Sequence, residues 1–138
     1  MTVVPQLADG RRALLLRFRY TTTSWSLEFP RCPVGGDLAW KEPAEDWLLE
    51  TLRLQAAALT LCGAVHVEPQ MLTTSNLVAW AENCAIERAF VADPNSLVAG
   101  LIFVTPANLD ELILSGDVHC GASLAALTLV RCREQRAK

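Results

Sequence analysis

Residues 25–54 read WSLEFPRCPVGGDLAWKEPAEDWLLETLRL, and this stretch decides the fold that the sequence predicts. Apolar and polar side chains alternate over residues 25–29, which predicts a short strand. Prolines and glycines punctuate residues 30–36, which predicts a loop. Pro43 suits the first position of a helix that runs to about Leu54. Strand, loop and helix in this order indicate a functional site, because a helix held against a sheet edge presents its side chains at fixed positions.

Length and composition predict one globular domain over residues 1–138. About half of the residues are apolar (51%) and a fifth are charged (20%), as in folded domains. A chain of this length can bury a sizeable core. The formal net charge is -3 and no block of Lys and Arg interrupts the chain, which argues against a nucleic-acid partner.

The five cysteines are an odd number and include no closely spaced pair. This pattern favours reduced thiols over a disulfide framework or a zinc site. No apolar run approaches the roughly 20 residues that span a bilayer, so the sequence indicates no membrane partner. We therefore expect a cytoplasmic protein.

The segments around residues 25–54 extend the pattern into a chain of strands followed by two helices. The Asp9-Gly10 pair predicts the turn of a hairpin, and Thr105 with Pro106 predicts the start of a helix that ends at Gly116. The predicted strands span 2–7, 13–19, 59–67, 71–82 and 97–104, with a loop over 82–96 and a closing helix over 121–133.

Three parts of this chain resemble the Nudix hydrolase family. The run RFRYTTTSWSLEFPR (17–31) is similar to the subgroup that acts on ADP-ribose and ADP-sugars, in which W-x-L-E-x-P-A/R-G leads into the Nudix box. Pro69, fifteen residues after Leu54, matches a proline of the same subgroup, although an ordinary turn proline also explains it. Residues 105–127 resemble its C-terminal helix pair. The resemblance implies an α/β (α+β) Nudix fold, with a mixed β-sheet sandwiched between helices.

The box itself is degenerate. Its pattern is Gly, five residues, Glu, seven residues, then Arg-Glu-apolar-x-Glu-Glu-x-Gly-apolar. Placing the last apolar position on Leu54 assigns the opening Gly to Cys32, the first Glu to Leu38, Arg-Glu to Asp46 and Trp47, Glu-Glu to Glu50 and Thr51, and the closing Gly to Arg53. Glu50 is the one carboxylate that remains at a position where the motif has glutamate.

The resemblance implies a reaction that these replacements undermine. Nudix enzymes cleave a diphosphate linked to another moiety by attack of water, assisted by Mg²⁺, which prefers hard oxygen ligands. The glutamates of the box share one helix face, whereas here Trp47 and Thr51 stand beside Glu50. We therefore predict a non-catalytic binding or regulatory module for a nucleotide diphosphate-type ligand or a protein partner, with Mg²⁺ as cofactor only if the protein is active.

Two alternatives stay open. The first is an ADP-ribose or ADP-sugar pyrophosphatase with unusual metal ligands, for which Glu50, Glu28 and Asp46 are the candidates. Its catalytic carboxylate would be Glu50, or Asp93 or Glu87 from the 82–96 loop. The second is a structural subunit of a homodimer or of a complex with another protein.

The predicted contacts with substrate are Glu28, Trp47 and Pro69. Glu28 matches the acidic position that lies near the metals in the subgroup, but it also suits an exposed carboxylate on the solvent face of a strand. Trp47 would face the cleft beside Glu28 and fill the space of the metals and diphosphate, or it would be a core residue on a slightly rotated helix.

Overall fold

The computed structural model describes residues 1–34 and 39–138, so the Leu38 position of the box lies outside the described residues. The helical elements are α1 (Lys41–Trp47), the π-helical turn Leu48–Leu52 that continues it, α2 (Pro106–Leu114) and α3 (Gly121–Ala137). The strands are β1 (Thr2–Leu7), β2 (Arg12–Arg19), β3 (Ser24–Glu28), β4 (Leu54–Gln55), β5 (Ala58–Val65), β6 (Asn76–Ile86) and β7 (Val98–Val104). None of the helices in the described ranges is long and apolar enough to cross a bilayer.

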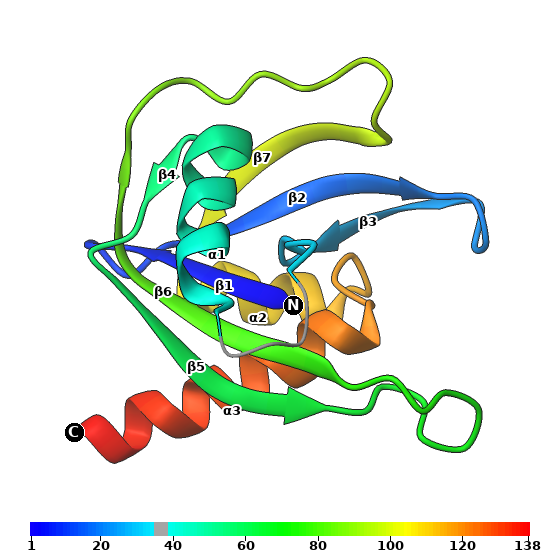
Figure 1. Ribbon diagram of the computed structural model, residues 1–138. Coiled ribbons are helices and arrows are strands. Elements are labelled where there is room, and N and C mark those ends of the chain that lie inside the picture. The colour runs from blue at the N-terminus through cyan, green and yellow to red at the C-terminus, as the bar shows by residue number, and fades with distance from the viewer. Residues whose placement is uncertain (35–38) are drawn as a thin grey trace.

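The seven strands form one mixed sheet, as predicted (Figure 1). β1 lies parallel to β6 and antiparallel to β2, and the latter pairs with both β3 and β7. On its other side β6 pairs antiparallel with β4 and β5. β1 and β6 therefore lie at the centre of the fold.

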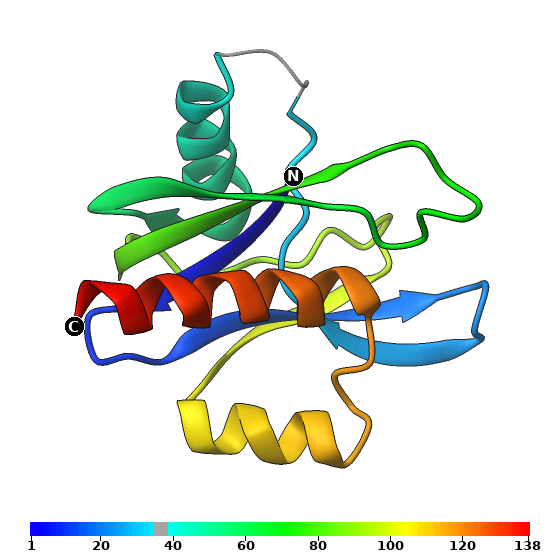
Figure 2. The ribbon, with the colours of Figure 1, turned by 90° about the horizontal axis from the view of Figure 1, so that it is seen from below.

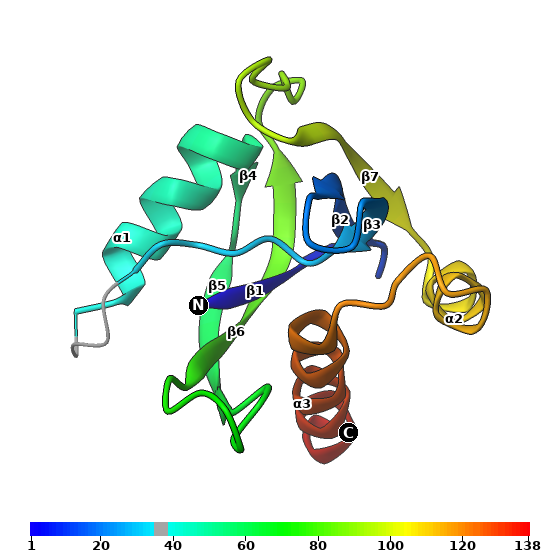
Figure 3. The same cartoon turned by 90° about the vertical axis from the view of Figure 1, so that its right-hand side faces the viewer.

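Helices cover both faces of this centre (Figures 2 and 3). Alternate residues of a strand point to opposite faces, and Val3 and Val4 of β1 are both fully buried, in two different clusters. We call α1 and the π-helical turn that continues it (41–52) the box helix. The cluster of Val3 includes Leu48 of the box helix, whereas that of Val4 includes Val130 of α3. The predicted sandwich of a mixed sheet between helices is confirmed.

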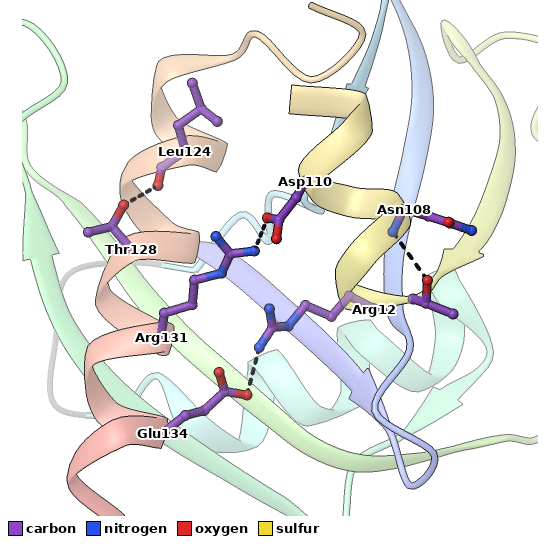
Figure 4. Close-up of polar contacts among 8 residues, drawn as sticks. Arg12, Asn108, Asp110, Leu124, Thr128, Arg131 and Glu134 are labelled. Atoms are coloured by element: carbon purple, nitrogen blue, oxygen red, sulfur yellow. Dashed lines mark hydrogen bonds and ion pairs between the residues drawn. The ribbon is translucent and has the colours of Figure 1, made fainter. Parts of the chain in front are cut away.

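Ion pairs fasten the last helix to its neighbours (Figure 4). Arg12 of β2 is 3% exposed, and its Nη2 lies 2.6 Å from Oε1 of Glu134 on α3. Arg131 of α3 pairs with Asp110 of α2. The predicted start of α2 is confirmed, because the Thr105 hydroxyl accepts a hydrogen bond of 3.2 Å from the backbone N–H of Asn108.

The predicted strand 71–82 and loop 82–96 are wrong in their bounds. Met71 and Leu72 lie in a turn in which both backbone N–H groups donate to the carbonyl of Glu68. The strand instead spans Asn76–Ile86, because its end pairs with β1 and β4, as in the pair of Leu54 with Ile86. These partners are distant in sequence, so local alternation gave the wrong bounds.

The box helix ends abruptly at Arg53. Its N–H donates to the carbonyl of Leu48, five residues earlier, which closes the π turn. Arg53 itself has φ 60° and ψ 30°, the left-handed conformation that favours glycine. The chain then enters β4, which pairs with the end of β6.

Replacing Leu48 by Ala should lower the free energy of unfolding by roughly 2–5 kcal/mol, because the side chain is fully buried between α1 and the sheet. Urea denaturation measures the change. Leu114→Ala on α2 is the matched control, since Leu114 is 82% exposed. Equal stability of Leu48→Ala and the parent would contradict the register of the box helix.

Replacing Arg53 by Gly should raise the free energy of unfolding by about 0.5–1 kcal/mol, since glycine adopts a positive φ without strain. The same denaturation experiment measures the gain. Arg53→Ala is the control, because it removes the side chain but keeps the steric conflict of Cβ. A gain in Arg53→Ala as large as in Arg53→Gly would show that the backbone conformation is not the cause.

Candidate functional site

A pocket of about 360 Å³ opens where the box helix, β2 and the segment between β6 and β7 meet. We call it the Trp47 pocket. In Figure 1 the segment of residues 87–97 arches over β7 beside the box helix. The described residues that line the pocket are Leu15, Arg17, Arg31, Pro33, Trp47, Thr51, Leu52, Phe90, Val91, Asp93, Ser96 and Val98.

The box helix presents Trp47 and Thr51 to the pocket. Trp47 ends α1 and Thr51 lies in the π-helical turn that follows, while Leu48 and Leu52 anchor the helix by almost complete burial. Trp47 is half-buried and packs against the core cluster that contains Leu48. It therefore both lines the pocket and packs on the core, but Glu28, beside which it was predicted to lie, is not among the described residues that line the pocket.

The conformation of Arg53 supports the predicted register. The motif has its closing glycine at this position, and here the residue has the left-handed conformation that glycine favours. In that register, which stays a prediction, Trp47 and Thr51 stand where the motif has two glutamates.

The structure does not bring Asp46 or Glu50 into the pocket. Both are exposed, and neither is among the described residues that line it. The π turn over Leu48–Leu52 holds one more residue than an α-helical turn, which alters the direction of the side chains after Trp47. Glu50, the surviving carboxylate of the box, is thus separate from the cavity beside it.

Glu28 is buried and paired, so the alternative of an exposed carboxylate is wrong. It is 3% exposed, and Oε1 accepts a hydrogen bond of 2.8 Å from Nε of Arg19, while Oε2 pairs with Nη2 of the same side chain. The register places Glu28 opposite Leu15, whose face of the sheet packs into the core. Burial alone would raise the pKa of Glu28, but the hydrogen bonds and charge of Arg19 outweigh it and lower the pKa.

Two arginines line the Trp47 pocket, and sequence reasoning missed both as site residues. Arg17 is half-buried on β2, and Arg31 is exposed just after β3. The pKa of Arg17 is lowered by burial and then by the charges of Arg19 and Arg31, with Glu28 opposing. The alternation of β2 could have placed Arg17 on one face, but nothing in the sequence brings the distant Arg31 to it.

Asp93 reaches the Trp47 pocket, whereas Glu87 and Pro69 do not line it. The Oδ1 of Asp93 accepts a hydrogen bond of 2.9 Å from the backbone N–H of Asn95, which shapes the turn. Pro69 lies in the connection that precedes β6, and Asp93 in the one that follows it. The strand has 11 residues, so at about 3.3 Å per residue its ends are some 33 Å apart.

Replacing Arg19 by Gln should destabilise the protein by about 2–3 kcal/mol at pH 7, because Glu28 then stays buried without its partner. The lowered pKa means that the pair stabilises the fold above the ordinary pKa of glutamate, about 4.3. This stability disappears as the pH falls through the lower pKa of the folded state. Urea denaturation of parent and variant should therefore give curves that converge in acid, and a pH-independent difference would contradict the assignment.

Comparisons with known proteins identify the fold through structure and not through sequence. No family model matches the chain, and the curated protein sequences contain no significant match. A crystal structure of an ADP compounds hydrolase is similar, with a TM-score of 0.79 and 20% identity over 99% of this chain and 72% of that one. A Nudix hydrolase from Nitrosomonas europaea has a TM-score of 0.59 and 14% identity over 95% of this chain and 86% of that one. The mixed sheet between helices, the box helix and these two neighbours together show that the chain has the Nudix hydrolase fold.

Proposed function

We propose that this chain binds a nucleotide diphosphate-type ligand in the Trp47 pocket without hydrolysing it by a Mg²⁺-dependent reaction. The observation that carries the proposal is the set of side chains that the box helix presents there, an indole and a hydroxyl at positions where the motif has carboxylates. The similar ADP compounds hydrolase supports the class of ligand.

The residues that line the pocket do not fit Mg²⁺. This ion prefers several hard oxygen ligands in octahedral geometry, of which carboxylates are the usual protein contribution. An indole offers no such atom, the hydroxyl of Thr51 is a weak ligand, and Asp93 is the single carboxylate among the described residues that line the pocket. Glu28 does not line it and already accepts two contacts from Arg19. Over residues 1–34 and 39–138 no group of three or more His, Cys, Asp or Glu side chains is placed to hold a metal.

The pocket suits an organic anion. Leu15, Leu52 and Phe90 give it apolar walls beside the ring of Trp47, and Arg17 and Arg31 give it positive charge. An aromatic ring can stack on a base or pack on a sugar, while guanidinium groups bind phosphate oxygens. Both halves of a nucleotide diphosphate therefore have matching surfaces in one cavity.

A hydrolase with unusual ligands is the second candidate, and the position of Asp93 favours it. This carboxylate lines the Trp47 pocket from the connection after β6, where the resemblance implied a catalytic carboxylate. Metal binding by Glu28, Asp46 and Glu50 would require Glu28 to leave Arg19 and the two exposed carboxylates to turn towards the pocket. The structural subunit, in a homodimer or with another protein, stays a prediction.

The protein should release no AMP from ADP-ribose above background in Mg²⁺, as measured by chromatography of the products. Removing Mg²⁺ ligands from an active Nudix site would forfeit several kcal/mol of charge stabilisation. Mg²⁺-dependent turnover that is lost in Glu50→Gln would contradict the proposal and establish the hydrolase.

Binding is tested in the same samples by tryptophan fluorescence during titration with ADP-ribose. We expect a change in the parent protein that is much smaller in Trp47→Phe, because Trp47 lines the pocket. Trp80→Phe is a control on the far side of the fold, where its indole N–H donates to Gln6. A change produced by Mg²⁺ alone and abolished in Trp47→Phe would show that metal reaches this face.

A further inference from the structure

We propose that Arg17 and Arg31 together bind a phosphate group of the ligand directly, and so take the place that metal ions have in a Nudix hydrolase. This inference rests on the proposed function of the Trp47 pocket. It adds that binding needs no divalent cation and that the two guanidinium groups supply the positive charge.

The two arginines come from separate segments and line the same cavity. Arg17 projects from β2, and Arg31 follows β3, where its backbone forms a bridge with Thr2. Neither forms an ion pair with a carboxylate of the described residues. Two positive charges that share a partly buried cavity repel each other, so an anion between them lowers the free energy of the site.

The neighbouring carboxylates do not cancel the positive charge of Arg17 and Arg31 in the pocket. Glu28 is paired with Arg19 and does not line the cavity, although its charge also acts on Arg17. Asp93 does line it, but its Oδ1 accepts the backbone N–H of Asn95. Among the described lining residues two cations face one anion, a formal excess of one positive charge in a protein whose formal net charge is -3.

The chemistry of arginine specifies a phosphate or diphosphate. The planar guanidinium presents N–H donors as a fork that matches two oxygens of a phosphate group, and it stays charged at neutral pH. Two such forks hold a multiply charged anion without the exact octahedral geometry that Mg²⁺ demands.

The uncharged residues that line the pocket favour a phosphate that carries an organic group. Trp47, Leu15 and Phe90 line the same cavity and offer no charge. Inorganic pyrophosphate would leave these surfaces in contact with water, whereas the sugar or base of a nucleoside diphosphate would cover them. The site should therefore prefer ADP-ribose or ADP to pyrophosphate.

Isothermal titration with ADP-ribose, in EDTA and in Mg²⁺, tests the inference. The affinity in EDTA should equal or exceed that in Mg²⁺, because Mg²⁺ bound to the diphosphate reduces its negative charge. Arg31→Gln and Arg17→Gln should each weaken binding about tenfold or more, as expected for the loss of a charge-assisted hydrogen bond. Pyrophosphate should bind more weakly than ADP-ribose.

Arg136→Gln is the matched control, since it removes the same charge from α3, which lies on the opposite face of the sheet from the box helix (Figure 3). Its affinity should equal that of the parent. Thermal melts without ligand accompany each titration, and Arg31→Gln should melt no lower than the parent because Arg31 has no ion-pair partner in the described ranges.

The outcomes separate this inference from the proposed function. Binding that requires Mg²⁺, or that weakens equally in Arg31→Gln and Arg136→Gln, would overturn the arginine site and leave a nucleotide-binding module in place. No binding of ADP-ribose under either condition would overturn both. Metal-free binding that both pocket variants weaken, with the control unchanged, establishes the assignment.

Discussion

The parallel pairing of β1 with β6 is the constraint on which the rest of the structure depends. Neighbouring residues at the centre of each strand, Val3 and Val4 of β1 and Val78 and Ala79 of β6, are buried in different clusters, so each face requires a helical cover there. The box helix supplies one cover through Ala44, Leu48 and Leu52, which are fully or almost fully buried. Because those residues fix the rotation of the helix, they also decide that Trp47 and Thr51 lie at the pocket. Core packing and site composition are therefore consequences of the same helix register.

The charges around the pocket are the reverse of those in a metal-dependent diphosphate hydrolase. Such a site gathers carboxylates and balances them with Mg²⁺. Here the buried carboxylate, Glu28, is balanced by Arg19 within the fold, and arginines line the cavity itself. A Nudix fold can thus carry a different set of charged side chains, because fold and chemistry reside in different residues.

Local sequence patterns predicted what local interactions determine. The Asp9-Gly10 turn is present, with Gly10 at φ 86°, and α2 has its expected cap at Thr105. The arrangement of a mixed sheet between helices was predicted from the family resemblance and not from local patterns. The pattern could not reveal the burial of Glu28, the meeting of Arg17 with Arg31 or the length of β6, because each depends on partners far along the chain. The sequence pattern also did not predict the π turn, because the hydrogen bond between residues i and i+5 follows from packing at the helix end and not from residue type.

Arg17 and Arg31 form no ion pair among the described residues, and the ligand binding that we propose for them would couple occupancy of the pocket to folding. A ligand that binds the folded state alone stabilises it in proportion to the logarithm of its concentration above Kd, and relief of repulsion between Arg17 and Arg31 is part of that gain. In the absence of turnover, the bound ligand is removed by dissociation only. The thermal stability of the protein would then rise and fall with the concentration of free nucleotide.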